Sequence, residues 1–120
     1  MLDVAGVGYL VAIPVSTFYR LGDVGSEASL LTYTHVREDT LALFGFLTGG
    51  EQELFELLIG VAGVGPKLAL NILSGIEPDE LVLALRSGDV ARLTRIPGVG
   101  KKTAERLILE LKDKAQKLAV

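Results

Sequence analysis

The sequence contains no cysteine and no tryptophan, and its one histidine is His35. Without cysteine, the chain has no disulfide, no thiol nucleophile and no cysteine-based zinc site. A lone histidine argues against a histidine-rich metal site and against a Ser-His-Asp triad. The chain also lacks a run of eighteen apolar residues, which a membrane span needs, and a secretory signal pattern. We therefore expect a cytoplasmic protein with no membrane contact, no metal and no cofactor.

The composition is that of a folded chain with an uneven distribution of charge. The 120 residues are 49% hydrophobic and 22% charged, which suits one domain or two very small ones. Residues 1–60 carry eight acidic and two basic side chains, whereas residues 61–120 carry seven acidic and ten basic ones. From Arg92 to Lys117 there are eight basic and three acidic side chains. Because affinity for a polyanion follows the local patch of charge, the second half is the candidate for nucleic-acid binding.

The first third of the chain is typical of short strands joined by turns. Glycines in Gly6-Val7-Gly8 predict a turn, Pro14 stops a β-prone run, and Glu38-Asp39 separates two long runs at the tip of a hairpin. The predicted strands are Leu2–Val4, Tyr9–Ile13, Ala28–Arg37 and Thr40–Phe46. Short strands of this kind indicate a small barrel or a sandwich.

After Gly49-Gly50 the hydrophobic pattern changes to the 3.6-residue period of helices. Glu51, Glu53 and Glu56 fall in the first turns of the first helix, where carboxylates complement the helix dipole. Gly75 and Gly88 are candidate helix ends. Later helices are predicted to begin at Pro66, at Pro78, after the N-cap Asp89 and at about Lys101. Strands followed by helices form a segregated α+β plan, with residues 1–47 and 48–120 as its two domains.

The helical half repeats itself with an offset of 35 residues. Gly63–Ala69 aligns with Gly98–Ala104, and both copies contain Gly-Val-Gly followed closely by lysine. Ile72 and Leu73 align in turn with Leu107 and Ile108. The repeating unit is a helix, a Gly-Val-Gly turn and a second helix.

The chemistry of this unit points to a phosphate. Glycines allow a tight turn and a close approach of a ligand, and the next helix begins with unpaired N–H groups at its positive end. Lys67, Lys101 and Lys102 add cations there, while Val64 and Val99 are expected to turn inward. The resulting candidate binding residues are Gly63, Val64, Gly65 and Lys67 in the first turn, and Gly98, Val99, Gly100, Lys101 and Lys102 in the second. Contacts from amides to phosphates predict duplex binding that selects structure and ignores base sequence.

Other interpretations of the same residues exist. One Gly-hydrophobic-Gly turn is usually only a turn, and a P-loop is disfavoured because its G-x-x-x-x-G-K-[ST] pattern is absent. A fragment of a helix-hairpin-helix nuclease or glycosylase would need a cluster of catalytic acids, but Asp79, Glu80 and Asp89 are scattered at helix-capping positions. An oligomerisation module would leave both lysine-bearing turns unexplained.

Five segments together resemble the RuvA family of bacterial Holliday-junction-binding proteins: Val4–Tyr9, Thr34–Asp39, Leu43–Phe46, Gly63–Gly75 and Pro97–Leu107. The resemblance implies an oligonucleotide-binding-type β-barrel followed by an all-α domain with two helix-hairpin-helix motifs. It further implies a homotetramer that holds a four-way junction open, with a second tetramer able to cover the other face. The partners implied are junction DNA, the ATP-driven motor RuvB and RuvC, in recombination, repair and the SOS response. The family's subunit has no catalytic residues.

The same resemblance implies roles for individual residues. The family's acidic pin falls on Glu38 and Asp39, whose charges would repel phosphates at the centre of the junction. Arg37 beside the pin is expected to contact a phosphate. Thr103 and Arg106 join the second turn's DNA-binding residues. His35 is expected to be packed in its strand rather than to act as a ligand.

The sequence departs from the family at both ends. Family members begin with an extra strand before the equivalent of Met1, so we expect an incomplete barrel with unpaired edges and a weakened tetramer. They also continue beyond the equivalent of Val120 into a linker and a helical third domain that binds RuvB. Coupling to the motor through these 120 residues is therefore not expected.

Overall fold

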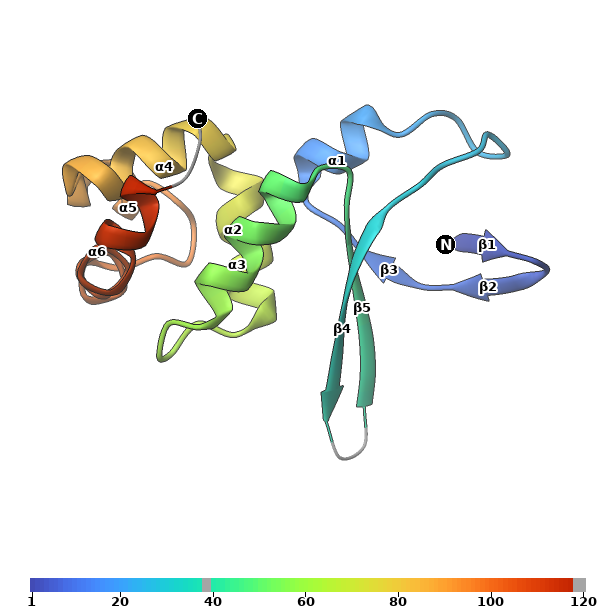
Figure 1. The fold of residues 1–120 in the computed structure, drawn as a ribbon, viewed down its shortest axis with the longest axis horizontal. Coiled ribbons are helices and arrows are strands. Elements are labelled where there is room, and N and C mark those ends of the chain that lie inside the picture. Colours follow the sequence, from blue (N-terminus) through green and yellow to red (C-terminus); the bar gives the residue numbers. More distant parts are fainter. Residues whose placement is uncertain (38–39, 118–120) are drawn as a thin grey trace.

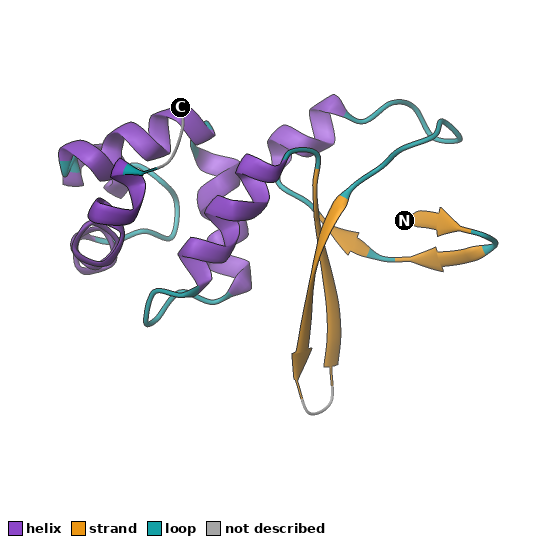
Figure 2. Cartoon of the chain, viewed as in Figure 1, coloured by secondary structure: helices purple, strands orange, loops and turns teal. Residues whose placement is uncertain are grey.

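The computed structural model of the chain describes residues 1–37 and 40–117. Strands gather at one end and helices at the other, so the predicted α+β class is confirmed (Figures 1 and 2). The strands are β1 (Leu2–Val4), β2 (Val7–Tyr9), β3 (Val11–Ala12), β4 (Leu31–Arg37) and β5 (Thr40–Phe46). The helices are α1 (Val15–Arg20), α2 (Gly49–Ile59), α3 (Pro66–Gly75), α4 (Pro78–Ser87), α5 (Val90–Thr94) and α6 (Lys101–Gln116).

The strands of the described residues form two separate sheets and close no barrel. β1 and β2 pair antiparallel, and a second sheet has the order β3-β5-β4. In that sheet β4 and β5 form the predicted hairpin, with Arg37 opposite Thr40 and Leu31 opposite Phe46. β3 runs parallel to β5, with Val11 opposite Leu43 and Ala12 opposite Phe44, so β3 lies beside the base of the hairpin. The β4–β5 hairpin projects away from the rest of the molecule (Figure 1).

Two sequence predictions in this region are wrong in detail. The turn expected at Gly6-Val7-Gly8 lies at Ala5 and Gly6, which have positive φ values of 52° and 86°. The Asp3 carboxylate accepts a hydrogen bond from the Gly6 N–H at 2.9 Å, and this contact fixes the turn one position earlier. The strand expected from Tyr9 to Ile13 is divided between β2 and β3.

Helix α1 was not predicted, because its sequence is β-branched and rich in hydroxyl residues, which favour caps and turns. Pro14, interpreted as the end of a strand, is also the N-cap of α1. The helix is held by contacts from distant residues. The hydroxyl of Ser74 in α3 accepts a hydrogen bond from the Val15 N–H at 3.1 Å, and the buried hydroxyl of Thr17 bonds to a side chain of α2.

Most of the helix starts and ends in the helical half are those predicted from the sequence. Thr48 caps α2 by accepting a hydrogen bond from the Glu51 N–H, Pro66 and Pro78 open α3 and α4, and Gly88 ends α4 with a positive φ of 69°. Gly75 is the last residue of α3 rather than its cap. None of the helices in the described ranges is long and apolar enough to cross a membrane.

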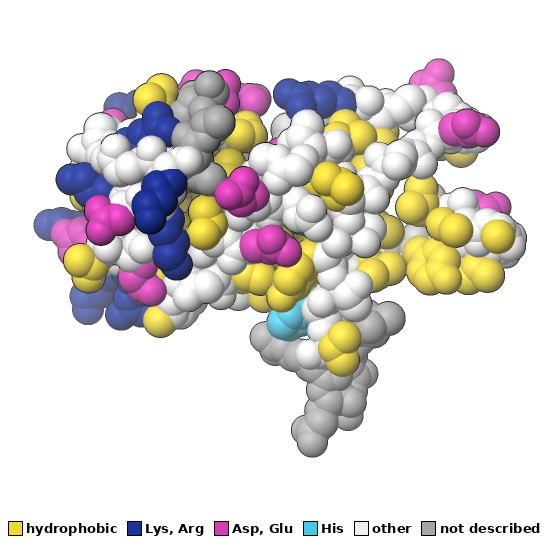
Figure 3. Space-filling model, in the orientation of Figure 1, with side chains coloured by type: hydrophobic (Ala, Val, Ile, Leu, Met, Phe, Trp, Pro, Cys, Tyr) yellow, Lys and Arg dark blue, Asp and Glu magenta, His cyan; other side chains and the backbone are white. Residues whose placement is uncertain are grey.

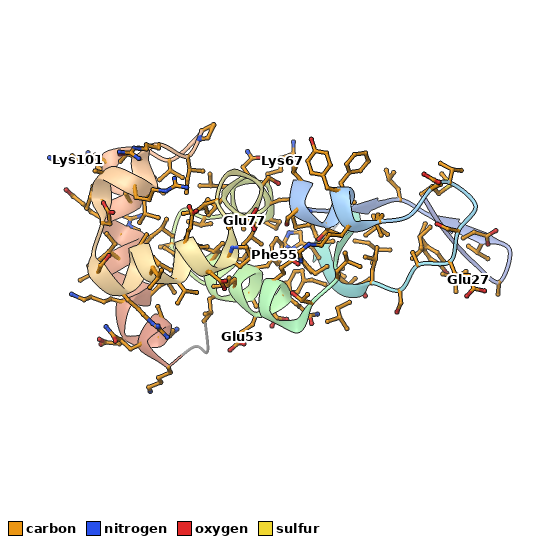
Figure 4. The ribbon with its side chains drawn as sticks, turned by 90° about the horizontal axis from the view of Figure 1, so that it is seen from above. Glu27, Glu53, Phe55, Lys67, Glu77 and Lys101 are labelled. Atoms are coloured by element: carbon orange, nitrogen blue, oxygen red, sulfur yellow. The ribbon has the colours of Figure 1, made fainter. Side chains whose placement is uncertain are left out.

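One hydrophobic core joins the strands to the helices. The Phe55 ring of α2 lies 5.4, 5.2 and 5.0 Å from the rings of Tyr33, Phe44 and Phe46, measured between ring centroids. Phe55 lies between the strand-rich and helical ends in Figure 4. The same core continues through Leu58 to buried leucines of α4, α5 and α6. The strands therefore pack directly on the helices that carry the repeat.

Candidate nucleic-acid interface

The two Gly-Val-Gly turns have the same backbone geometry. Gly63 and Gly98 have φ values of +86° and +90°, a region that disfavours residues with a side chain. In each turn the valine N–H donates to the carbonyl three residues earlier, Val64 to Val61 and Val99 to Ile96, at 3.0 Å in both cases. The glycine that follows is the N-cap of the next helix, with a φ of −93° at Gly65 and −89° at Gly100. The predicted repeat is thus a structural repeat.

The valines of the turns face inward. Val64 is 6% exposed and Val99 is 5% exposed. Both valines belong to the same buried hydrophobic core as Leu58 and Leu93, which are related by the same 35-residue offset and are both fully buried. Burial of the valines anchors each turn to the core, as expected. The surface of each turn that meets solvent is therefore its backbone.

The start of the helix after each turn is open. A Cβ atom placed on Gly65 or Gly100 would meet nothing within 4 Å. No side chain caps α3 or α6 in the described structure, and neither helix has an acidic residue in its first turn. By contrast, Thr48 and Asp89 cap α2 and α5, the helices that enter the two turns. The open helices therefore present N–H donors to an external anion.

The two turns are not equivalent as anion sites. Pro66 is the first residue of α3 and has no N–H, whereas Lys101 at the same place in α6 has one. The second turn is followed by two exposed lysines, Lys101 and Lys102, and the first by Lys67 alone. The second turn thus has more donors and more positive charge.

Arg106 and Leu68 connect the turns to each other. Nη1 of Arg106 in α6 donates a hydrogen bond to the carbonyl oxygen of Ala62, beside Gly63, at 3.1 Å. A Cβ atom on Gly98 would lie 3.5 Å from Cδ1 of Leu68 in α3. The helix that follows each turn therefore has a side chain close to the other turn. Arg106 was predicted at the second turn only, because nothing in the sequence indicates a contact with Ala62.

The cations of the turns share one edge of the molecule. Lys67 and Lys101 lie along the same edge in Figure 4, and Glu53 lies on the opposite edge. In Figure 3 most of the Lys and Arg side chains are found over the helical end, while hydrophobic side chains cover β1 and β2. Thr103, in the first turn of α6, is partly buried.

The residues predicted near the hairpin tip are placed only in part. Glu38 and Asp39, the predicted acidic pin, lie outside the described residues. The backbone of Arg37 pairs with Thr40 at the end of β4, while its side chain is not described. His35 lies in β4 with its ring 6.5 Å from that of Tyr33, between centroids.

The acidic residues that a nuclease would need have structural roles. Asp89 caps α5 by accepting a hydrogen bond from the Arg92 N–H at 3.0 Å. Glu80, in the first turn of α4, forms an ion pair with Arg92 at 2.8 Å. Asp79 lies beside it in that turn. Within residues 1–37 and 40–117, no three acidic or histidine side chains are grouped as metal ligands would be.

We expect Asp89→Ala to lower the free energy of unfolding by about 1 kcal/mol, because α5 loses its N-cap. Asp89→Asn keeps a side-chain oxygen at the same place and should remain close to the unchanged chain. Urea denaturation followed by circular dichroism measures both. Equal losses in the two variants would mean that the charge of Asp89, and not its capping oxygen, is what matters.

Comparisons with known proteins agree along the chain. The family model of the RuvA N terminal domain matches residues 1–45, and the SAM-like Helix-hairpin-helix tandem matches residues 55–113. The Holliday junction branch migration complex subunit RuvA of Geobacter metallireducens is 58% identical over 120 residues, which is 100% of this chain and 60% of the relative. The corresponding subunit of Solibacter usitatus is 59% identical over 114 residues, covering 95% of this chain and 58% of the relative.

The match extends to more distant relatives. The Syntrophus aciditrophicus subunit is 52% identical over 114 residues, or 95% of this chain and 56% of the relative. The chain spans at most about 60% of the length of these curated relatives. With both halves matched in order, and with the helix-hairpin-helix geometry repeated in the structure, the chain belongs to the RuvA family.

Proposed function

We propose that this chain binds four-way (Holliday) junction DNA without regard to base sequence and holds it open for branch migration in recombination and repair. It acts without catalysis of its own, and the RuvB motor supplies the ATP-driven step. Support comes from relatives named as subunits of the Holliday junction branch migration complex. The observation that carries the proposal is the pair of open, lysine-bearing glycine turns with one geometry.

The turns fit a phosphate backbone rather than base edges. Each has an approachable glycine, uncapped N–H groups at a helix start and at least one exposed lysine. Such donors fix the position of a duplex and carry no sequence information. Two turns held together through Arg106 and Leu68 would contact the two strands of one duplex at a constant separation. The DNA-binding residues of the proposal are those predicted, with Gly65 and Gly100 acting through open backbone and Val64 and Val99 as anchors.

Assembly around the junction is also part of the proposal. The chain forms a homotetramer, so that four copies bind the four arms, and a second tetramer covers the other face. RuvB and RuvC are further partners in the full-length family, and all of them meet the DNA in the cytoplasm. Exposed apolar side chains on β1, β2 and α1 offer surface that contacts between copies would bury: Val4, Val7, Tyr9, Phe18 and Tyr19. The boundary between the two domains lies at Thr48, with strands in 1–47 and the DNA-binding helices in 48–120.

A gel-shift titration of a four-way junction against a linear duplex of the same sequence tests the function. We expect tighter binding of the junction and the same order of affinities when the base sequence is scrambled. Sedimentation of the free chain and of the complex counts the subunits. Equal affinity for both DNA forms would overturn junction selectivity, and cleavage of either one with magnesium would support the nuclease alternative instead.

The acidic pin gives a separate prediction. Replacing Glu38 by Gln together with Asp39 by Asn should raise affinity for linear duplex and lower the preference for the junction. Two fewer negative charges per copy repel phosphates less, and the penalty on duplex that runs straight across the centre is lost. Both effects should be about threefold to tenfold at low salt and smaller at high salt. Loss of all DNA binding in a folded variant would assign these acids a structural role.

A further inference from the structure

Two polar side chains are buried within the described residues, and they bond to each other. Thr17 is fully buried and Glu51 is 2% exposed. The Thr17 hydroxyl donates to Oε2 of Glu51 at 2.9 Å. Thr17 belongs to α1 in the strand-rich domain, and Glu51 belongs to α2 in the helical domain. This contact, which we call the Glu51–Thr17 clasp, therefore crosses the proposed domain boundary.

Both oxygens of the Glu51 carboxylate have partners. Oε2 also accepts from the Ser16 hydroxyl at 3.5 Å, and Oε1 accepts from the Thr48 hydroxyl at 3.2 Å. The Arg20 guanidinium lies 3.7 Å from Oε1. Removing a carboxylate from water costs a large free energy unless hydrogen-bond donors and cations surround it, and here α1 supplies two donors and one cation. The position of α1 on α2 is thus determined by directional contacts.

The other contacts across the boundary restrict orientation less. The rings around Phe55 are apolar, and apolar burial is non-directional. Hydrogen bonds also cross the boundary from the Val15 N–H to Ser74 and from the Gln52 side chain to the Thr32 carbonyl, and both of these are solvent-exposed. A buried and fully satisfied polar contact selects one arrangement among several that the core would accept.

The place of α1 in the chain makes this arrangement matter for DNA. α1 follows β3 and precedes β4, and β3 pairs with β5. The clasp thus links the helices that carry the two glycine turns, through α1 and β3, to the sheet that contains the β4–β5 hairpin. A linear duplex needs only the turns. Binding of a four-way junction, as proposed above, also needs the hairpin at a constant angle to the turns. Each copy must present its turns and its hairpin to the junction at the same time.

We propose that Glu51 is a positioning residue whose clasp with Thr17 sets the orientation of the strand-rich domain on the helical domain, and that this orientation gives the preference for junction over duplex. The predicted preference for junction over duplex rests on the proposed function. The orientation of the two domains does not, and it can be measured without DNA.

Matched substitutions at Thr17 test the clasp. Thr17→Val keeps the shape and removes the hydroxyl, whereas Thr17→Ser keeps the hydroxyl. Glu51→Ala removes the carboxylate and leaves the backbone N–H that Thr48 caps. Because the sequence has no cysteine, spin labels can be attached at Val36→Cys in β4 and Leu109→Cys in α6, where the native side chains are 69% and 84% exposed. Electron–electron resonance then gives the distance distribution between the two domains.

We expect a narrow distribution in the unchanged chain and in Thr17→Ser, and a broadened one in Thr17→Val and Glu51→Ala. The ratio of junction to duplex affinity should fall about tenfold in the last two, as expected from loss of a buried hydrogen bond to a charged group. Duplex affinity should stay within about twofold, since the turns are untouched. If Glu51→Ala does not fold, Thr17→Val provides the test.

Unchanged distances and an unchanged affinity ratio in folded Thr17→Val would overturn the inference. A parallel fall in junction and duplex affinity would also overturn it, because that is the result of general destabilisation. If the unchanged chain shows no preference for junctions, the proposed function fails, and the proposed role of the clasp in junction preference fails with it. The distance distributions still decide whether the clasp fixes the domains.

Discussion

The double variant Gly65→Ala/Gly100→Ala is expected to fold like the unchanged chain and to bind DNA on the order of 100-fold more weakly. Both glycines have negative φ values that alanine adopts, and a Cβ atom at either position meets nothing within 4 Å. The two methyl groups would instead stand in the space through which a phosphate must approach the first N–H groups of α3 and α6. Melting temperature and a fluorescence-anisotropy titration measure the two quantities separately.

Gly49→Ala is the matched control. Gly49 begins α2, and a Cβ atom there also meets nothing within 4 Å. Gly49 is not part of either turn, because the whole of α2 separates it from the first one. Its DNA affinity should stay within about twofold of the unchanged chain. Full affinity in the Gly65/Gly100 double variant would show that these helix starts do not contact phosphate.

Gly98→Val tests the same turn through its conformation. Gly98 has a φ of +90°, which a β-branched residue adopts only with strain of about 1–3 kcal/mol. Valine should therefore lower stability and DNA affinity together, whereas alanine at Gly100 should lower affinity alone. Comparing Gly98→Val with the alanine at Gly100 therefore distinguishes loss of the turn's conformation from obstruction of the phosphate's approach.

The repeat was predictable from sequence because its signal is local. Gly-Val-Gly at a fixed offset, proline at helix starts and Asp89 as a cap each act within a few residues of themselves, and the structure has them where the pattern predicts. The burial of Val64 and Val99 follows from the same local pattern, since each is the one apolar residue between the two glycines of its turn. The strand pairing of β4 with β5 was also visible as two long β-prone runs.

The features that sequence analysis missed depend on distant residues. Helix α1 has poor local propensity and is fixed by Glu51 and Ser74, more than 30 residues away. Glu51 itself was interpreted only as a complement to the helix dipole, and its position in the first turn of α2 is confirmed. Thr48, three residues earlier, marks Glu51 as a helix-capping partner, but no local pattern indicates its burial against Thr17, which is 34 residues away. The hydrogen bond from Arg106 to Ala62 was not predictable either, because the two residues are 44 positions apart.

The second large effect is expected from Lys101→Glu combined with Lys102→Glu, which should weaken binding to junction and duplex alike by about 100-fold or more at low salt. Both lysines are exposed at the open start of α6, where no acidic residue offsets them in the first turn. Each phosphate contact that is lost should flatten the slope of log K against log salt by about 0.9. The two negative charges introduced would also repel the backbone, an effect that salt screens.

Lys112→Glu with Lys117→Glu makes the same change in net charge and is the control. Both residues are exposed, and Lys112 lies about 16 Å further along α6 than Lys101 at the rise of an α-helix. If net charge alone governs binding, the two double variants should weaken it equally and leave similar salt slopes. If the turn is the phosphate site, only the Lys101/Lys102 variant should lose slope, and the control should keep it. Because the second turn has more donors than the first, Lys67→Glu should cost less affinity than either Lys101→Glu or Lys102→Glu alone.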